Sequence, residues 1–570
     1  MVDFADKPLI RGLSTDDVAP YINANMPFVP VATEQIGDRL LWQKLFDREN
    51  QAYAHLMQRD PAFVVGRRGA GKTAFLDSLA TNQTTINIEI NTSTAVAEIE
   101  DLLRALTDLG VTLFADHVSD IWGAALWHGL LVGLVQEPPE TVDTEDVRFQ
   151  DLKVYLDDLT DDASQSVSCE AVMSMFCMEL LDQAEKTRTV ARHPTLFELH
   201  GVKLAAIIES VGALLDEAKV QPILLLDSIE DFQDVLDYHT RTIEGPFMQV
   251  GRSTQPTAPY RIRFSFPAEL WHVLRAMSRN PLKDFGRFVI LQWSAREIVK
   301  IAAHRFMIYL EHFHRPFLDR NRDIARLNTD SERESLELLR LVLPPTVQGE
   351  LGVVEDTIAY VLRHTQLLPR HLLRLLNAIW TRSNDGDGVR ATAEAVIIGI
   401  QDVEEQIVTE ICKAYELVHP TADEVCRAVI KNLPRRFNDS DLHKAFNRVG
   451  KGAVKRAHRN LAERRLAERS HRVGVTNFAS PETDYFDFKA MLLEIGCIGR
   501  RIGQTDRYDV AEFEYTIPHR LAVGDDDIMC VHPLFSGVYQ SMPDVDGNGD
   551  RLLVYPYGTD PTVDHRLRDT

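Results

Sequence analysis

The sequence predicts an α/β protein built on a parallel sheet that is wrapped by helices. Short apolar runs suited to buried strands alternate with segments of helical periodicity, and a glycine-rich loop follows the first run directly. The predicted strands are residues 62–65, 85–90, 223–226, 261–266 and 288–291. Because helical segments separate most of these runs, we expect the strands to pair in parallel through helical crossovers.

The segments between and after these strands are mainly helical in pattern. Residues 98–218 show helical periodicity that is broken near Pro138-Pro139 and Pro194, which predicts a long helical insertion. Helices are expected again from 295 to about 415. In the last 150 residues, short helices accompany an expected strand pair at 512–517 and 528–531.

The chain has 570 residues, a length that is typical of several domains rather than one. We expect an N-terminal extension at 1–55 with an amphipathic helix at 36–57, followed by a core with a phosphate loop at 56–297 that contains the helical insertion at 98–218. A helical lid and linker (298–420), a winged-helix-like α+β domain (421–540) and a tail (541–570) come next.

Composition restricts the environment and the partners. The N-terminal residues lack a basic start followed by an apolar run, and no uncharged apolar run reaches about 18 residues, so we expect a cytoplasmic protein without a membrane partner. None of the six cysteines lies in a C-x-x-C pair, which favours reduced thiols. The net charge of −23 repels nucleic acid, so any such contact requires a local basic patch.

The segment from Gly66 to Thr73, GRRGAGKT, matches the phosphate-loop pattern G-x-x-x-x-G-K-[ST] between a strand and a helix. Glycines let backbone N–H groups turn toward phosphates, and the helix N-terminus adds partial positive charge. Lys72 would contact the β- and γ-phosphates of ATP, and the Thr73 hydroxyl would hold Mg²⁺. The residues assigned to nucleotide binding are Gly66, Arg67, Arg68, Gly69, Ala70, Gly71, Lys72, Thr73 and Ala74. Arg67 and Arg68 either touch phosphate or face solvent or a partner, and we favour the second alternative.

A second acidic motif follows the apolar run at 223–226. Asp227 ends this strand, at the edge of a parallel sheet where the phosphate loop also lies, so it is placed to hold Mg²⁺ through water together with Thr73. Glu230 is the first candidate to orient the attacking water, and Asp231 is the second. The alternative for these two acids is stabilisation of a helix N-terminus through its dipole.

Three kinds of polar residue could complete the site. Ser265 lies in a predicted core strand, where it either reads the γ-phosphate or is a satisfied strand serine. Arg370 follows a proline at the start of a helix and could reach a γ-phosphate from the lid. Arg287 or Arg279 could act in trans as an arginine finger, although a structural role is favoured for both.

These motifs together resemble the AAA+/STAND side of the P-loop ATPases. The segments GRRGAGKT, LLLDSIED, Gln292-Trp293-Ser294 and LLPRHLLRLL are most similar to those of bacterial ATPases described as Orc/Cdc6-like, over residues 56–385 and more loosely to 540. The resemblance implies a P-loop ATPase core, a helical lid and a C-terminal winged helix.

The resemblance also has functional implications. It implies that Arg370 is the second sensor arginine. AAA+ members usually place the catalytic glutamate directly after the metal-binding acid, where this chain has Ser228, and the STAND-like spacing to Glu230 and Asp231 implies slow hydrolysis. Members use ATP for oligomerisation or switching, often on DNA or in defence against phage, which implies a homo-oligomer and an antiphage role.

Residues 427–472 reverse the overall charge of the chain. This segment has 14 basic and 4 acidic residues, a balance of 14 − 4 = +10. Asn438 is expected to cap a helix at 441–446, and a further helix is predicted at 453–469. Basic residues on such helices suit contacts with DNA or RNA phosphates. The alternative is a solvated helix face or a dock for acidic surfaces.

Three hypotheses for the function follow. The preferred one is a Mg²⁺-dependent, ATP-driven switch or assembly ATPase. The second is a nucleic-acid-binding scaffold in which the nucleotide is mainly structural, and it rests on residues 427–472. The third is a regulatory ATPase subunit that restrains a separate effector protein, for which the insertion at 98–218 offers a binding region.

Overall fold

The computed structural model describes the greater part of the chain. The described residues are 22, 26–28, 61–78, 85–90, 92–110, 115–160, 169–186, 195–227, 236–254, 258–270, 287–349, 352–383, 388–416, 418–469, 484–505, 507–516, 521–542 and 553–560. The helix expected at 36–57 lies outside them. Two compact units are present: a sheet unit, residues 53–66 and 72–291, and a C-terminal unit, residues 1–52, 67–71 and 292–570.

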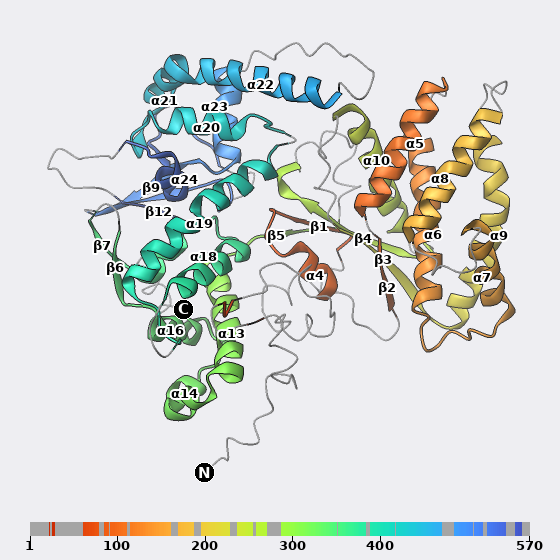
Figure 1. The fold of residues 1–570 in the computed structure, drawn as a ribbon, viewed down its shortest axis with the longest axis horizontal. Coiled ribbons are helices and arrows are strands. Elements are labelled where there is room, and N and C mark those ends of the chain that lie inside the picture. The colour runs from red at the N-terminus through yellow and green to blue at the C-terminus, as the bar shows by residue number, and fades with distance from the viewer. Residues whose placement is uncertain are drawn as a thin grey trace. The chain divides into compact units, whose positions relative to one another are not determined.

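The sheet unit contains a five-stranded parallel sheet, with the strand order β2-β3-β4-β1-β5 (Figure 1). The strands are β1 (Phe63–Gly66), β2 (Thr85–Ile90), β3 (Gln221–Leu226), β4 (Arg261–Pro267) and β5 (Phe288–Leu291). All of β1 is buried, as are Pro222–Leu226 of β3, as expected for strands covered on both faces. The predicted α/β class with a parallel sheet is confirmed. The strand β4 separates β1 from β3, so the strands that carry the phosphate loop and Asp227 are not direct neighbours.

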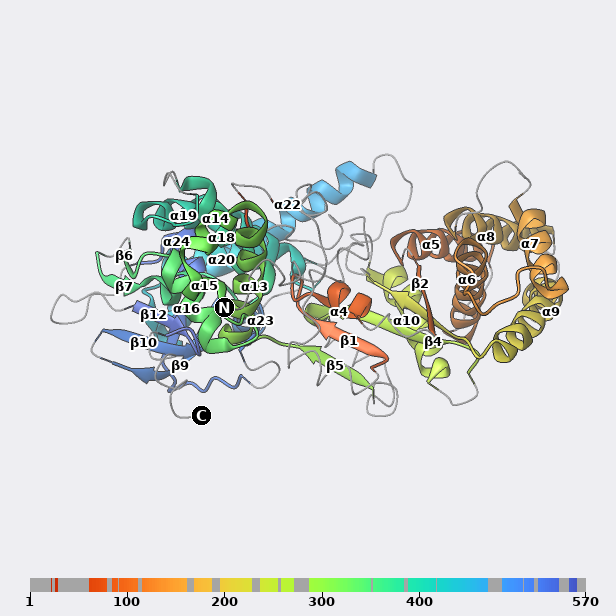
Figure 2. The ribbon, with the colours of Figure 1, turned by 90° about the horizontal axis from the view of Figure 1, so that it is seen from below.

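The predicted helical insertion is present between β2 and β3. It comprises α5 (Thr92–Asp108), α6 (Ala115–Gln136), α7 (Val147–Thr160), α8 (Cys169–Lys186) and α9 (Thr195–Glu217). The helix α6 packs on β2 and on α8, while α7 packs on α9, so the insertion forms a bundle beside the β2 edge of the sheet (Figure 2). Among the described residues of this unit, α4 (Lys72–Ser78) and α10 (Leu236–Ser253) are further α-helices, and both contact β4.

One helix of the described chain is long and apolar enough to cross a membrane. The segment His117–Gln136 of α6 passes this test by length and composition, but 72% of its most apolar window is buried inside the structure. Because α6 packs against α8, α10 and β2, its apolar surface is explained by the core of the bundle.

The C-terminal unit begins with a run of helices. They are α13 (Ala295–Phe313), α14 (Arg315–Arg320), α15 (Arg322–Ala325), α16 (Glu332–Val342), α17 (Thr357–Arg363), α18 (Pro369–Arg382) and α19 (Ala393–Ala414). Ser294 and Glu297 form a capping box at the start of α13, and Pro369 occupies the first turn of α18. The sequence analysis missed a short antiparallel hairpin here, β6 (Thr346–Gln348) with β7 (Val354–Asp356).

The rest of this unit is an α+β domain around a second sheet, with the strand order β12-β10-β9-β11-β8. Its elements are α20 (Ala422–Ile430), β8 (Arg436–Phe437), α21 (Asp439–Ala445), the π-helical turn Phe446–Gly450, α22 (Lys451–Arg469), α23 (Tyr485–Glu494), β9 (Ile498–Gln504), β10 (Tyr508–Glu512), β11 (Met529–Val531), α24 (Pro533–Tyr539) and β12 (Leu553–Pro556). The predicted cap at Asn438 is confirmed, since its side chain accepts from the Asp441 N–H.

The strand predicted at 528–531 is present as β11, but the strand predicted at 512–517 and its pairing with 528–531 are wrong. The segment after β10 turns, because the Thr516 hydroxyl donates to the Phe513 carbonyl (2.6 Å) and accepts from the Phe513 N–H (3.1 Å). A threonine side chain that bonds nearby backbone groups in this way competes with the hydrogen bonds of a strand ladder. The strand β11 instead pairs with β8 and β9. The strand β12, within the range predicted as a tail, pairs in parallel with β10.

Candidate functional site

The phosphate loop connects β1 to α4 through a tight backbone turn. Gly69 and Gly71 have positive φ angles of 87° and 85°, and the Ala70 N–H donates to the Arg67 carbonyl at 2.9 Å. Residues with a Cβ rarely adopt such φ angles, so these two positions require glycine. Lys72 begins α4 and is buried. The loop therefore has the local conformation that its sequence motif predicts.

Asp227 lies within hydrogen-bonding distance of the phosphate-loop helix in the sheet unit. The Thr73 hydroxyl donates to Asp227 Oδ2, and the Ser265 hydroxyl donates to Asp227 Oδ1. The register of the sheet explains the second contact, because Leu226 pairs with Phe264 and the following residues of β3 and β4 then come side by side. Ser265 is therefore a partner of Asp227, and it is fully buried.

This cluster fits a magnesium ion. A carboxylate and a hydroxyl in contact are the hard oxygen ligands that Mg²⁺ prefers, and Mg²⁺ commonly binds through one or two protein oxygens plus water and phosphate. Among the described residues, no group of three or more His, Cys, Asp or Glu side chains could hold a metal ion. If the ion accompanies a nucleotide here, Thr73 and Asp227 would supply its protein ligands, and phosphate and water would supply the others.

The loop residues 67–71 make their contacts within the C-terminal unit. The Trp293 indole N–H donates to the Ala70 carbonyl at 2.8 Å, and the Arg370 backbone N–H lies 3.5 Å from the Gly69 carbonyl. A Cβ added at Gly69 would lie 3.0 Å from the Arg370 Cβ, so a side chain at position 69 would displace Arg370 as well as strain the backbone. Arg370 of α18 thus lies next to Gly69.

Arg67 extends from the loop toward two tyrosines of the C-terminal unit. Its guanidinium carbon lies 5.8 Å from the centre of the Tyr415 ring and 5.5 Å from that of Tyr515. Both distances suit cation–π interactions. Arg67 also contributes to lowering the pKa of His371, for which burial is the main cause. The predicted solvent or partner role of Arg67 is thereby replaced by an intramolecular contact, whereas Arg68 is half-buried.

Comparison with known proteins adds a structural likeness. No protein-family model and no curated protein sequence matches the chain. A solved structure of the ORC2 protein from Aeropyrum pernix, in ADPNP and ADP complexes, is similar with a TM-score of 0.33 and 10% identity. The likeness covers 90% of this chain and 97% of that one. Because this TM-score is below 0.5, the functional conclusion depends on the residues of the site.

Several predicted site residues are not brought together by the described structure. Glu230, Asp231 and Arg279 lie outside the described residues. Arg287 precedes β5 and its carbonyl accepts from the N–H groups of Ala62 and Phe63, at 2.8 and 3.1 Å. A backbone role of Arg287 is therefore visible in the sheet unit.

Sequence reasoning missed the aromatic residues around the phosphate loop. Tyr415 ends α19 and Tyr515 lies in the turn after β10, so no local motif connects them to Arg67. Trp293 was noted as part of a motif, but its bond to Ala70 could not be inferred. The only local signal for these contacts is that the second and third loop positions, Arg67 and Arg68, are both arginine.

The basic region has an exposed stripe on α22. Lys451, Lys455 and Arg459 are exposed and recur every four residues, while Ala453 and Ala457 are buried on the other side. Residues four apart lie on one helix face. Among residues 427–460, whose burial the structure describes, the exposed basic residues are Arg427, Lys431, Lys444, Arg448, Lys451, Lys455, Arg456 and Arg459.

Proposed function

We propose that the chain is an ATPase that binds ATP with Mg²⁺ and acts as an ATP-driven switch or assembly factor. The observation that carries the proposal is the contact between Thr73 of the phosphate loop and Asp227 at the end of β3. A glycine turn that matched the motif by chance would not be expected to bring the Thr73 hydroxyl against the Asp227 carboxylate. In a phosphate-binding site, the two groups would share the cation that accompanies ATP.

The other residues receive roles from their positions. Lys72 would neutralise the terminal phosphates, and the bound ion would neutralise the charge that remains on them. Ser265 would orient Asp227, since it donates to the carboxylate oxygen that Thr73 does not use. Arg370, next to Gly69, would respond to the γ-phosphate, and Glu230 or Asp231 would orient the attacking water.

A switch function follows from the contacts of the loop. Three residues from different parts of the C-terminal unit contact residues 67–71. They are Trp293, which precedes α13, Arg370 of α18, and Tyr515 of the α+β domain. A phosphate that reorders the loop would change these contacts, and its release would reverse the change. Homo-oligomerisation and an antiphage role stay predictions from the resemblance, and an effector partner stays a prediction that the insertion at 98–218 suggests.

ATP turnover and ATP binding by site variants test the proposal. Lys72→Met, Thr73→Val and Glu230→Gln are compared with the parent in the presence of Mg²⁺. Two matched controls remove the same groups elsewhere: Lys203→Met, an exposed lysine of α9, and Thr107→Val, whose hydroxyl donates to the Leu103 carbonyl.

We expect turnover to fall by about 100-fold or more in the Lys72 and Thr73 variants, the scale for removing one group that stabilises transition-state charge. The controls should retain the parental rate. Equal turnover in the parent, Lys72→Met and Thr73→Val would refute the assignment.

A second function, contact with nucleic acid, is favoured by the exposed stripe on α22. The stripe presents Lys451, Lys455 and Arg459 on one helix face of a chain that is otherwise acidic. Replacing all three with Gln should lower the slope of log binding constant against log salt by about 0.9 per lost contact on duplex DNA. The matched control replaces three exposed arginines, Arg320, Arg322 and Arg326. No binding by the parent at low salt would remove this function.

A further inference from the structure

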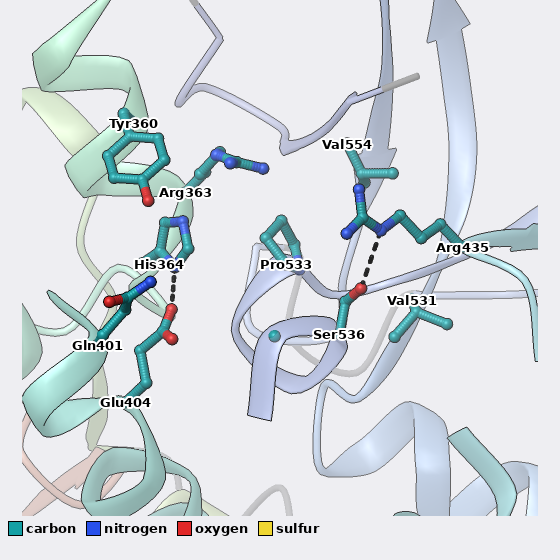
Figure 3. Close-up of a pocket in the computed structure, with 11 residues that line it drawn as sticks. Tyr360, Arg363, His364, Gln401, Glu404, Arg435, Val531, Pro533, Ser536 and Val554 are labelled. Atoms are coloured by element: carbon teal, nitrogen blue, oxygen red, sulfur yellow. Dashed lines mark hydrogen bonds and ion pairs between the residues drawn. The ribbon is translucent and has the colours of Figure 1, made fainter. Parts of the chain in front are cut away.

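A polar pocket lies in the C-terminal unit, apart from the phosphate loop residues. It contains about 520 Å³ of space between atoms, including the part that opens to solvent. Its walls come from α17, α19, α24 and the ends of β11 and β12 (Figure 3). The lining residues are Tyr360, Arg363, His364, Gln401, Glu404, Arg435, Val531, Pro533, Ser536, Gly537 and Val554.

Two guanidinium groups face this pocket in fixed orientations. Arg363 Nη2 donates to Glu355 Oε1 at 3.0 Å, and Arg363 Nε lies 3.0 Å from Glu355 Oε2. The Tyr555 hydroxyl donates to Glu355 Oε2 at 2.7 Å, which holds the carboxylate behind the arginine. On the opposite wall, Arg435 Nε donates to the Ser536 hydroxyl at 3.1 Å (Figure 3). Both side chains are therefore preorganised.

His364 has one ring nitrogen occupied and one without a partner. Its Nδ1 makes a short contact with Glu404 Oε1, and because a carboxylate only accepts, this nitrogen carries the proton. The Nε2 atom is buried and has no hydrogen-bond partner among the described residues, in a side chain that is only 9% exposed. Figure 3 shows the ring between Arg363 and Glu404, on the wall of the pocket.

A buried polar atom without a partner destabilises the folded state unless something binds it. Here the atom lines a space that also holds two arginines, Arg363 and Arg435. With the proton on Nδ1, Nε2 of the neutral ring is an acceptor, so a ligand there must bring a hydroxyl hydrogen, as hydrogen phosphate does. The lining side chains include two guanidinium groups and the Glu404 carboxylate, and Glu355 pairs with Arg363 from outside the lining. Guanidinium groups suit a ligand with negative charge and several acceptor oxygens.

We propose that this pocket binds a small oxyanion of the phosphate class. Its hydroxyl group would donate to His364 Nε2, and its other oxygens would accept from the guanidinium groups of Arg435 and Arg363. Such a ligand would connect α17 and α19 to α24 and β12. Anion binding there would couple the helices that follow the lid to the C-terminal sheet domain, without requiring the nucleotide site.

The test measures phosphate binding in a Lys72→Ala chain, so that the phosphate loop does not contribute. Thermal unfolding and calorimetry are followed with inorganic phosphate and, separately, with chloride at the same ionic strength. We expect a saturable stabilisation by phosphate that chloride does not produce. No saturable difference between the two salts would overturn the proposal.

Two variants assign the binding to the pocket. His364→Asn keeps a donor near the Nδ1 position for Glu404 and lacks Nε2, and Arg435→Gln removes one cation. We expect each to raise the dissociation constant for phosphate about tenfold, the scale of one hydrogen bond to a charged group. Arg320→Gln, an exposed arginine of α14 that does not line the pocket, is the control and should keep the parental constant.

A third variant keeps every charge in place. Gly537→Ala adds a methyl group whose nearest neighbours are the carboxylate atoms of Glu404, at 3.4–3.8 Å, an ordinary contact distance. Because alanine is compatible with the helix α24, the chain should fold, while the pocket becomes narrower. We expect weaker phosphate binding. Unchanged affinity in Gly537→Ala, or in folded His364→Asn, would overturn the proposal.

Discussion

Two carboxylate clusters of this chain differ in the partners that surround them. In the sheet unit, Asp227 accepts from two hydroxyl groups, those of Thr73 and Ser265, which carry no charge. In the C-terminal unit, Glu355 is held by the guanidinium of Arg363, and Glu404 by the imidazole of His364. The first cluster orients a negative charge without neutralising it, whereas the second pairs its negative charges with cationic or ionisable groups.

This difference indicates what each site can bind. A carboxylate fixed by hydroxyls remains available to a cation, so the Asp227 cluster suits Mg²⁺ with a nucleotide. Carboxylates that support cationic groups leave those groups facing the pocket, which suits an anion. The sign of the ligand therefore follows from the partner of each carboxylate, and four predictions test the comparison.

The largest effect on stability is expected when a neutralised carboxylate loses its partner. Arg363→Met would leave Glu355, whose side chain is 1% exposed, as a buried charge. Breaking such a pair typically costs about 3–5 kcal/mol of unfolding free energy. Urea unfolding should show this loss, and the double variant with Glu355→Gln should recover most of it. An Arg363→Met variant as stable as the double variant with Glu355→Gln would contradict the role assigned to the Arg363–Glu355 ion pair.

The next prediction concerns Asp227, whose carboxylate is held by hydroxyl groups. It separates an effect on ATP turnover from an effect on unfolding free energy. Asp227→Asn should lower ATP turnover by about 100-fold or more, because the charge that holds the ion is lost. Its unfolding free energy without Mg²⁺ should change by only about 1 kcal/mol, the scale of one hydrogen bond. The matched control, Ser265→Ala, removes one hydrogen bond and keeps the charge. Equal losses of turnover in both variants would contradict the prediction.

Two buried histidines make the C-terminal unit sensitive to acid. Burial is the main cause that lowers the pKa of His371 and of His532 well below the usual 6.5, and Arg67 lowers both further. Below pH 6.5 the unfolded chain therefore binds more protons than the folded chain, so the unfolding free energy should fall with pH. Each residue contributes up to about 1.4 kcal/mol per pH unit.

Denaturant unfolding of the C-terminal unit within the whole chain, at pH 7.5, 6.5 and 5.5, measures this dependence. His371→Gln should reduce the loss between pH 6.5 and 5.5. A stability that stays constant or rises on acidification in the parent chain would show that these two histidines titrate normally. It would also show that these buried histidines do not make the unfolding free energy of the unit fall with pH.

The smallest effect concerns the loop arginine. Arg67→Met keeps an apolar side chain between the rings of Tyr415 and Tyr515 but removes the cation, at an expected cost of about 0.5–1 kcal/mol. Arg68→Met is the matched control from the next loop position. A double-mutant cycle with Tyr515→Leu isolates the interaction from other effects of each substitution. Equal stability of the two arginine variants would contradict the proposed contact.

Much of the sheet unit could be predicted from the sequence, because its signals are local. The phosphate loop requires glycine where φ is positive, as at Gly69 and Gly71, and the buried strands appear as apolar runs. Their parallel pairing follows from the helices between them. The C-terminal sheet was less predictable. β9, with its many polar residues, was missed, and the alternation at 512–517 was wrongly interpreted as a strand.

The sequence alone determined the chemistry of the phosphate loop and the acid at the end of β3, since each is encoded in a few consecutive residues. Only the tertiary structure decided which distant residues join them. Register placed Ser265 against Asp227, and folding brought Tyr415 and Tyr515 to Arg67 and His364 to Glu404. The physical reason is that a hydrogen bond or ring contact depends on separation in space, which local periodicity does not contain.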